Sequence, residues 1–350
     1  MTILYILLAI ALLGVLITVH EYGHFIAARL TGIAVKEYSV GLGPKLLQWK
    51  SKKHETLFTL RPIPMGGYCM FYGDETDQQN ADDPRAFDKA KVWKRMLTVF
   101  SGPLMNFVLA FVLAVALMAG YGYVVSQPYV ADVEASMPAA EAGLQAGDEL
   151  IAVDGQSIAV GDVTALTAAI EALPDGGSIT LTVLRDGETL DLSLTPVWDE
   201  AEQRDRIGIG IRAYASLPAG QIVPAAWNSC VYASTVILDS LGKLVTTGEG
   251  ASDAAGPIGV VQLVAEETQK GGLEIFLNLA VIISINLALI NLLPIPGLDG
   301  SRLVFMLIEV IRRKPINRKI EATVHLVGYA LLLGLMVFFT FRDVGRIITG

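Results

Sequence analysis

Four long apolar stretches constrain the fold of this chain more than any other feature. They cover residues 2–28, 97–125, 275–293 and 323–341. Each is long enough to cross the hydrocarbon layer of a bilayer as a helix. With 53% hydrophobic residues, the chain is predicted to be a polytopic α-helical membrane protein with about four transmembrane helices. A fifth apolar stretch, 224–246, contains Asp239 and Lys243, and we expect an amphipathic helix that lies on the membrane or against a soluble domain.

The charges between these stretches predict the orientation of the chain. Residues 29–95 carry 12 Lys and Arg and residues 302–319 carry 6, whereas residues 124–274 carry 6 basic and 22 acidic residues. The positive-inside rule therefore predicts a cytoplasmic location for the first and last segments, an extracytoplasmic middle segment, and both termini outside. The first apolar stretch lacks the basic start and the cleavage site of a signal peptide, so we expect it to be retained.

Residues 31–91 are predicted to form a β-rich region beside the first helix. Three runs have strand character, Val35–Val40, Lys45–Trp49 and Thr56–Leu60, and glycines and prolines punctuate the region. Irregular backbone at membrane depth is tolerated only where protein or a water-filled cavity surrounds it. We therefore expect a membrane-associated β-hairpin that dips into the bilayer and offers its edge near Gly66–Phe71 to an extended peptide. A hairpin that lies entirely in the cytoplasm is the alternative.

Residues 127–197 have the pattern of a compact soluble module. A short helix near Ala139 is followed by a Gly-Asp turn at 147–148, a strand, an Asp-Gly hairpin turn at 154–155 and an alternating run at Ser178–Val183. This order resembles a bacterial PDZ domain. The resemblance implies an inserted extracytoplasmic α+β domain that either binds a peptide C-terminus as an added strand or acts as a steric filter that binds no peptide.

The sequence from His20 to His24 reads His-Glu-Tyr-Gly-His and lies inside the first apolar stretch. Two histidines four residues apart share one face of a helix. With Glu21 they form the H-E-x-x-H arrangement, in which two imidazoles bind zinc and the carboxylate acts as a base. Because ionisable groups at membrane depth are costly and usually functional, this context favours a metal site over a chance match.

A zinc site with two imidazoles needs at least one further protein ligand. Asp299 is our candidate, because it follows two prolines and a glycine that break the third apolar helix within residues 291–300. A broken helix at membrane depth lines a cavity, where a carboxylate can reach a metal. The alternatives are that Asp299 only caps the helix that begins at Ser301, or that His54 or His325 is a ligand.

These motifs together resemble those of the site-2 protease family of intramembrane zinc metalloproteases. The resemblance rests on His20–His24 and on Asn-Leu-Leu-Pro-Ile-Pro-Gly-Leu-Asp-Gly at 291–300, with support from Met65–Tyr68 and from Gly-Pro-Leu-Met-Asn at 102–106. It covers essentially the whole chain. The chain is most similar to the bacterial regulator-of-sigma-E protease type, although only a single PDZ domain is visible where some members carry two.

The resemblance implies that His20, His24 and Asp299 bind Zn²⁺ and that Glu21 is the general base. Five further residues are expected to contact the substrate strand, two by the resemblance and three from the hairpin edge: Asn286, Asn291, Gly66, Gly67 and Tyr68. The asparagine amides suit bonds to an extended backbone, and bonds between helices are the alternative. For Asn106 on the second helix, a packing role and a catalytic role both remain open.

The resemblance also implies a function. We expect an endopeptidase that cleaves transmembrane segments of single-pass membrane proteins, such as anti-sigma factors already trimmed by another protease, or signal-peptide remnants. The expected location is the bacterial inner membrane, in contact with lipid. The alternatives are a membrane-embedded PDZ scaffold or receptor with a vestigial metal site, and an anchored peptidase of soluble substrates. The net charge of −9 gives no support for nucleic-acid binding.

These features predict the order of segments along the chain. The predicted segments are transmembrane helix 1 at 1–30, the β-hairpin region at 31–91, helix 2 at 92–125, the PDZ domain at 126–197, a linker with the amphipathic helix at 198–274, the broken helix 3 at 275–311, a cytoplasmic loop at 312–322 and helix 4 at 323–342. Cys69 and Cys230 are expected in different compartments and therefore form no disulfide.

Overall fold

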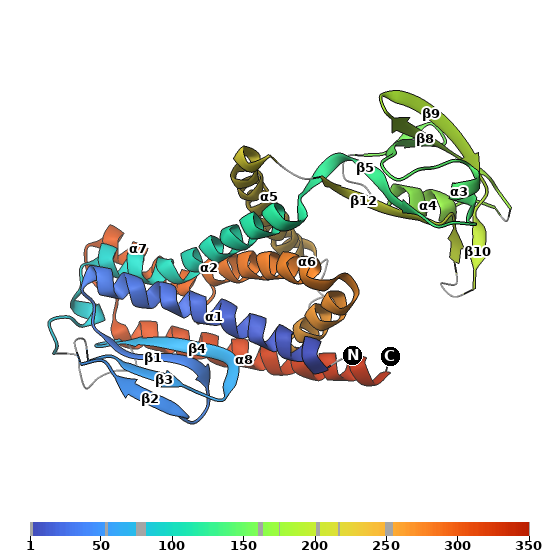
Figure 1. The fold of residues 1–350 in the computed structure, drawn as a ribbon. Helices are drawn as coiled ribbons and strands as arrows, with labels where there is room; N and C mark the ends of the chain where they lie inside the picture. The colour runs from blue at the N-terminus through green and yellow to red at the C-terminus, as the bar shows by residue number, and fades with distance from the viewer. Residues whose placement is uncertain are drawn as a thin grey trace. The chain divides into compact units, whose positions relative to one another are not determined.

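The computed structural model describes residues 3–52, 55–74, 82–159, 164–174, 176–200, 204–215, 218–248 and 255–349. The chain divides into two compact units (Figure 1). We call Met1–Leu117 with Ala226–Gly350 the helical unit, and Met118–Ala225 the sheet unit.

The helical unit contains the four long apolar helices that the sequence predicts. They are α1 (Ile3–Thr31), α2 (Val92–Tyr121), α6 (Pro257–Leu292) and α8 (Arg318–Thr349). Among the described residues, these are the helices long and apolar enough to cross a membrane. The stretch at 224–246 is also helical, as part of α5 (Ala219–Thr247).

The third apolar helix follows a second, shorter helical part that its hydropathy did not indicate. Element α6 starts at Pro257 but is interrupted by a kink at the non-helical Gly272, with φ of 65°, and the part after this kink corresponds to the helix expected from residue 275. The first part contains Glu266, Glu267 and Lys270, which lower its hydropathy. It is nevertheless held in place by a buried face that includes Val264 and packs against α1. Apolar length alone therefore predicts the part of α6 after Gly272 and misses the part before it.

After Leu292 the chain leaves the helix for a short break and resumes as α7 (Asp299–Arg312). This is the predicted interruption at the two prolines, and it puts Asp299 in the first turn of α7. Helices α1 and α6 pack through small and branched residues, as expected where close contact rather than exclusion of water holds helices together. The buried residues of this contact are Ala9, Leu12, Leu16, Val264, Ala265 and Ala280.

A four-stranded sheet packs on α1 through its strand β4 (Figure 1). Its strands are β1 (Val35–Leu42), β2 (Leu47–Lys50), β3 (Leu57–Leu60) and β4 (Ile63–Phe71), in the order β2-β3-β1-β4. The three predicted runs correspond to β1, β2 and β3, and the predicted edge near Gly66–Phe71 lies in β4. Among strands consecutive in the chain, only β2 and β3 pair as a hairpin, because β1 pairs parallel with β3 and antiparallel with β4. The prolines and glycines of β4 suggested an irregular segment, but a strand with one neighbour tolerates proline. The hairpin prediction was therefore incomplete.

The sheet unit contains an antiparallel sheet and two short helices, α3 (Pro138–Glu141) and α4 (Ala165–Glu171). The sheet has the order β12-β5-β6-β8-β9, with β7 paired to β6. Its strands are β5 (Tyr123–Val133), β6 (Glu149–Val153), β7 (Gln156–Ser157), β8 (Ile179–Arg185), β9 (Glu188–Leu194) and β12 (Ile209–Ala215). A separate pair joins β10 (Val197–Asp199) to β11 (Arg204–Arg206). Because β12 pairs with β5, the sheet continues past the predicted boundary at 197.

The predicted Gly-Asp turn of this unit is held by an ion pair. Asp148 is buried, and its carboxylate accepts hydrogen bonds of 2.7 Å from both Nε and Nη2 of Arg185. These bonds hold the pKa of the Asp148 carboxyl below its usual range. The turn is thereby tied to the end of β8.

Candidate metal centre

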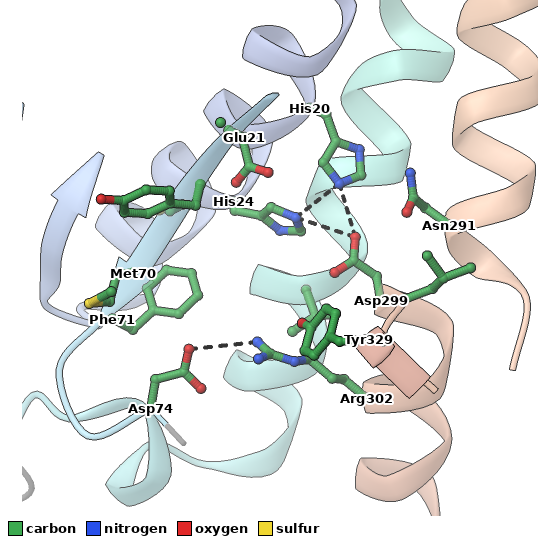
Figure 2. A pocket seen from close by; sticks show the side chains of 16 residues that line it. His20, Glu21, His24, Met70, Phe71, Asp74, Asn291, Asp299, Arg302 and Tyr329 are labelled. Atoms are coloured by element: carbon green, nitrogen blue, oxygen red, sulfur yellow. Dashed lines mark hydrogen bonds and ion pairs between the residues drawn. The ribbon is translucent and has the colours of Figure 1, made fainter. Parts of the chain in front are cut away.

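His20 and His24 occupy the same buried face of α1, one turn apart. Each side chain leaves 9% of its surface exposed, and the two Nε2 atoms are 3.2 Å apart. Asp299 reaches them from the first turn of α7, with its Oδ2 atom 3.0 Å from Nε2 of His20 and 3.3 Å from Nε2 of His24 (Figure 2). The structure thus brings together three residues that the sequence separates by up to 279 positions.

The spacing of these three atoms fits a zinc ion. Tetrahedral zinc with ligand bonds of about 2.0–2.2 Å places its ligand atoms about 3.3–3.6 Å from one another. The measured separations are 3.0, 3.2 and 3.3 Å. Two imidazole nitrogens and a carboxylate oxygen are also the donor set of catalytic zinc sites, which keep one position open for water. Within the described residues, this is the cluster of His, Cys, Asp or Glu side chains that could hold a metal.

Both imidazoles are held at their second nitrogen. Nδ1 of His24 lies 2.9 Å from the backbone oxygen of Thr98 on α2. Since a carbonyl only accepts, Nδ1 of His24 carries the proton and Nε2 presents its lone pair. Nδ1 of His20 lies 3.3 Å from the amide of Asn106, also on α2. Helix α2 therefore orients both imidazoles.

Close contact between α1 and α2 makes this arrangement possible. A Cβ atom on Gly102 would lie 2.3 Å from Nε2 of His24 and 2.9 Å from Nε2 of His20. A Cβ on Gly23 would lie 2.1 Å from the backbone oxygen of Ser101. Gly102 therefore leaves room beside Nε2 of both histidines.

The short break before α7 is also tightly packed. Gly300 follows Asp299, and a Cβ there would lie 2.2 Å from the backbone oxygen of Leu292 and 2.3 Å from that of Leu293. The start of α7 thus lies directly against the end of α6. This contact fixes where the Asp299 carboxylate emerges, which a simple helix-capping role for Asp299 would not require.

A cavity of about 460 Å³ opens beside the cluster. It is lined by His20, His24, Asp299 and by Glu21, whose carboxylate lies next to His24 in Figure 2. Of the five residues expected to contact substrate, three line it: Gly67, Tyr68 and Asn291. Gly66 and Asn286 are absent from the described residues that line this cavity.

One wall of the cavity is the free side of β4. Residues 67–71 of this strand line the cavity, and β1 is the strand to which it pairs among those described. Tyr68 is anchored from the sheet side, because its hydroxyl donates to Glu37 at 2.9 Å and accepts from Arg61 at 2.6 Å. The strand edge is therefore held rigidly beside Glu21.

The other end of the cavity is ionic. Arg302 on α7 lies 3.7 Å from Asp74, which follows β4, and Tyr329 of α8 completes this wall (Figure 2). Sequence reasoning missed Asp74, Arg302 and Tyr329, because no local motif marks them. The charged side chains of Asp74 and Arg302 therefore give this end of the cavity a surface that water can hydrate.

The remaining candidates lie elsewhere. His325 is buried near Ser301 and Gly297, with its Nδ1 3.4 Å from each, and it is not part of the cluster. His54 lies outside the described residues. Cys69 and Cys230 are both free cysteines, as expected.

A hydrolytic metal site on helices that can cross a bilayer defines the class of membrane-embedded metallopeptidases. Comparison with known proteins agrees. The peptidase family M50 matches residues 8–335. A "Putative zinc metalloprotease" of Agrobacterium fabrum is 32% identical over 370 residues, covering 98% of this chain and 96% of that protein. A protein with the same description from Nostoc sp. is 36% identical over 363 residues, covering 98% and 97%.

The "Regulator of sigma-W protease RasP" of Bacillus subtilis is 29% identical over 418 residues, covering 97% of each chain. Among solved structures, the PDZ domain of the SdrC-like protein from Listeria monocytogenes matches 25% of this chain and 87% of that one, with a TM-score of 0.22 and 20% identity. The chain belongs to peptidase family M50, the site-2 protease family. It is an intramembrane zinc metalloendopeptidase, which confirms the predicted enzyme class and cofactor and leaves the scaffold alternative without support.

Proposed function

We propose that His20, His24 and Asp299 are the zinc ligands and that Glu21 is the general base. This assignment rests on the positions of Nε2 of His20, Nε2 of His24 and Oδ2 of Asp299. The three atoms come from two helices far apart in the sequence, and their spacing is close to that of tetrahedral zinc ligands. When bound, zinc polarises a carbonyl and lowers the pKa of water to about 7. Glu21 lies beside His24 on the cavity wall. There it accepts the proton of the attacking water and passes it to the leaving amine.

The assignment is tested by the zinc content of an Asp299→Ala variant. Outer-shell changes typically cost about 10–100-fold in metal affinity, so we expect removal of a ligand to lower zinc affinity more than 100-fold. Zinc affinity of the purified chain is measured by competition with a chelator, alongside cleavage of a single-pass substrate. An Asp239→Ala variant is the control, since Asp239 is exposed and pairs with Lys243 on α5. Retention of zinc by Asp299→Ala would contradict the ligand set.

We further propose that the substrate is bound as an added strand on β4. A transmembrane helix must unwind before its peptide bonds can be cut, because its backbone is hydrogen-bonded to itself. Residues 67–71 of β4 line the cavity next to Glu21 and can replace those bonds. The amide of Asn291 lies on the opposite wall and donates to Leu287 within its own helix. It retains a carbonyl oxygen to accept from the substrate backbone.

Strand addition predicts a requirement for one N–H group. Tyr72 donates its N–H to Ala34, on the β1 side. Since N–H groups alternate between the two sides of a strand, that of Cys69 points away from β1. We expect Cys69→Pro to reduce cleavage strongly while zinc binding is retained, because proline removes this donor. Cys69→Ala keeps the N–H and is expected to cleave as the unmodified chain does. Equal cleavage by both variants would argue against strand addition.

The substrates we propose are single-pass membrane proteins, anti-sigma factors among them, that another protease has already trimmed. The relative named as a regulator of sigma-W protease supports this class. The location we propose is the bacterial inner membrane, with the sheet unit extracytoplasmic and both termini outside. The segment 124–274 is strongly acidic and the flanking segments are basic, which supports that orientation.

We propose that the sheet unit is a PDZ-like filter that excludes untrimmed substrates. Tyr123 and Ala215 are paired across β5 and β12, so their Cα atoms are only about 5 Å apart. A short Gly-Ser linker can therefore replace the whole sheet without pulling on α2 or α5. We expect this variant to cleave untrimmed substrates that the complete chain leaves intact, as judged by electrophoresis of both substrate forms. Unchanged discrimination would exclude the filter and leave peptide binding as the role of the unit.

A further inference from the structure

Asn106 is a buried polar residue whose side chain contacts the metal centre. It is fully buried on α2, and its Nδ2 atom lies 3.3 Å from Nδ1 of His20. Its backbone oxygen accepts a hydrogen bond of 2.8 Å from Ser284 of α6. Its side-chain oxygen Oδ1 has no hydrogen-bond partner among the described residues. Among the described residues, His20 is therefore the hydrogen-bond partner of the Asn106 side-chain amide.

Interhelical packing alone does not explain such an amide. A buried amide with one unsatisfied end costs stability, and an apolar side chain of similar shape would avoid that cost. The hydrogen bond that joins α2 to α6 at Asn106 runs from the Ser284 hydroxyl to the backbone oxygen of Asn106. The side-chain amide of Asn106 takes no part in this bond. The role of the amide must therefore be sought at His20.

The orientation of the amide is coupled to the proton of His20. As the structure has it, Nδ2 faces Nδ1, so Nδ1 accepts and the proton lies on Nε2, next to Asp299. A metal ligand needs the lone pair of Nε2, which requires the proton on Nδ1. An amide presents oxygen instead of nitrogen at nearly the same place after half a turn about its Cβ–Cγ bond. Oδ1 of Asn106 would then accept from Nδ1–H.

We propose that Asn106 is a positioning residue for the metal centre, whose amide oxygen holds the proton of His20 on Nδ1 when the metal is bound. This inference rests on the proposed ligand set. Asn106 would do for His20 what the backbone oxygen of Thr98 does for His24. The difference is that a backbone carbonyl cannot rotate, whereas the Asn106 amide can stabilise both the metal-free and the metal-bound form of its imidazole.

The test is zinc affinity of the full chain in detergent, measured by chelator competition. Outer-shell partners of metal-bound histidine typically contribute about 10–100-fold in affinity, and we expect a loss of this size for Asn106→Leu, which has a similar shape and suits an apolar bundle. Asn106→Asp keeps an acceptor oxygen and is expected to lose less than Asn106→Leu. Ser284→Ala removes the other contact of Asn106 and is expected to bind zinc normally.

A second measurement needs no variant. In the zinc-loaded chain, nitrogen NMR of labelled histidine should show the His20 proton on Nδ1. Normal zinc affinity of Asn106→Leu, equal losses in the Leu and Asp variants, or an unprotonated Nδ1 would each overturn the proposal. If Asp299→Ala abolishes zinc binding while Asn106→Leu does not, the ligand set stands and only the role of Asn106 fails. If Asp299→Ala retains zinc, the proposed ligand set itself fails.

Discussion

Replacing Glu21 by Gln should abolish most of the peptidase activity while leaving zinc bound. Gln has nearly the same shape, but its amide cannot take the proton of water. General acid–base catalysis typically contributes about 10²–10⁴-fold, so we expect turnover to fall by that factor. Glu21 lies outside the group of atoms that could hold the metal. Zinc content should therefore be unchanged.

The measurement is turnover of a purified single-pass substrate, with zinc determined on the same sample. Glu267→Gln is the matched control, because Glu267 is part-exposed on α6 and pairs with Lys270; its turnover should equal that of the unmodified chain. Substantial turnover by Glu21→Gln would show that another group accepts the proton. Loss of zinc would show instead that Glu21 supports the ligand cluster.

The sequence predicts those parts of the site that depend on local geometry. A spacing of four residues puts His20 and His24 on one helix face whatever the rest of the chain does. The prolines before Asp299 end a helix for equally local reasons. The shared helix face of the two histidines and the helix break before Asp299 are both found in the structure, which brings the three side chains together. That they bind the metal remains our proposal.

Features that depend on tertiary contact could not be predicted in the same way. The backbone oxygen of Thr98 contacts His24. Every residue type has a backbone oxygen, so the amino-acid sequence does not indicate this contact. Strand β4 contains Pro64, Gly66 and Gly67, so its composition indicated an irregular edge and not a regular nine-residue strand. It forms a strand because β1 lies beside it and α1 packs against it. The part of α6 before Gly272 likewise depends on its buried face, which includes Val264, and not on its hydropathy.

The membrane setting explains why close packing matters so much at this centre. Without water to exclude, helices are held by close contact of small residues and by buried polar bonds. At the metal centre both occur together, since Gly102 of α2 lies against the same imidazoles that Thr98 and Asn106 contact. One helix thus sets both the distance and the orientation of the His20 and His24 imidazoles. A change at any of these positions should act on metal binding before it acts on the fold.

Replacing Gly102 by Ala is therefore expected to eliminate zinc binding and activity together. The added Cβ would lie 2.3 Å from Nε2 of His24 and 2.9 Å from Nε2 of His20, and real Cβ contacts are never so short. Either α2 moves away or the imidazoles rotate, and both outcomes separate the ligand atoms. Alanine favours a helix over glycine by about 1 kcal/mol, so the loss cannot come from a weaker α2.

The control for this variant lies on the same helix. Gly120 has open space where a Cβ would be added, so Gly120→Ala should bind zinc and cleave substrate as the unmodified chain does. Zinc content and thermal unfolding are measured for both variants in the same detergent. We expect Gly102→Ala to remain folded without metal, because Gly102 lies on α2 and the buried contact between α1 and α6 is untouched. If Gly102→Ala keeps zinc at normal affinity, the ligand nitrogens cannot lie against this helix as closely as the distances above require.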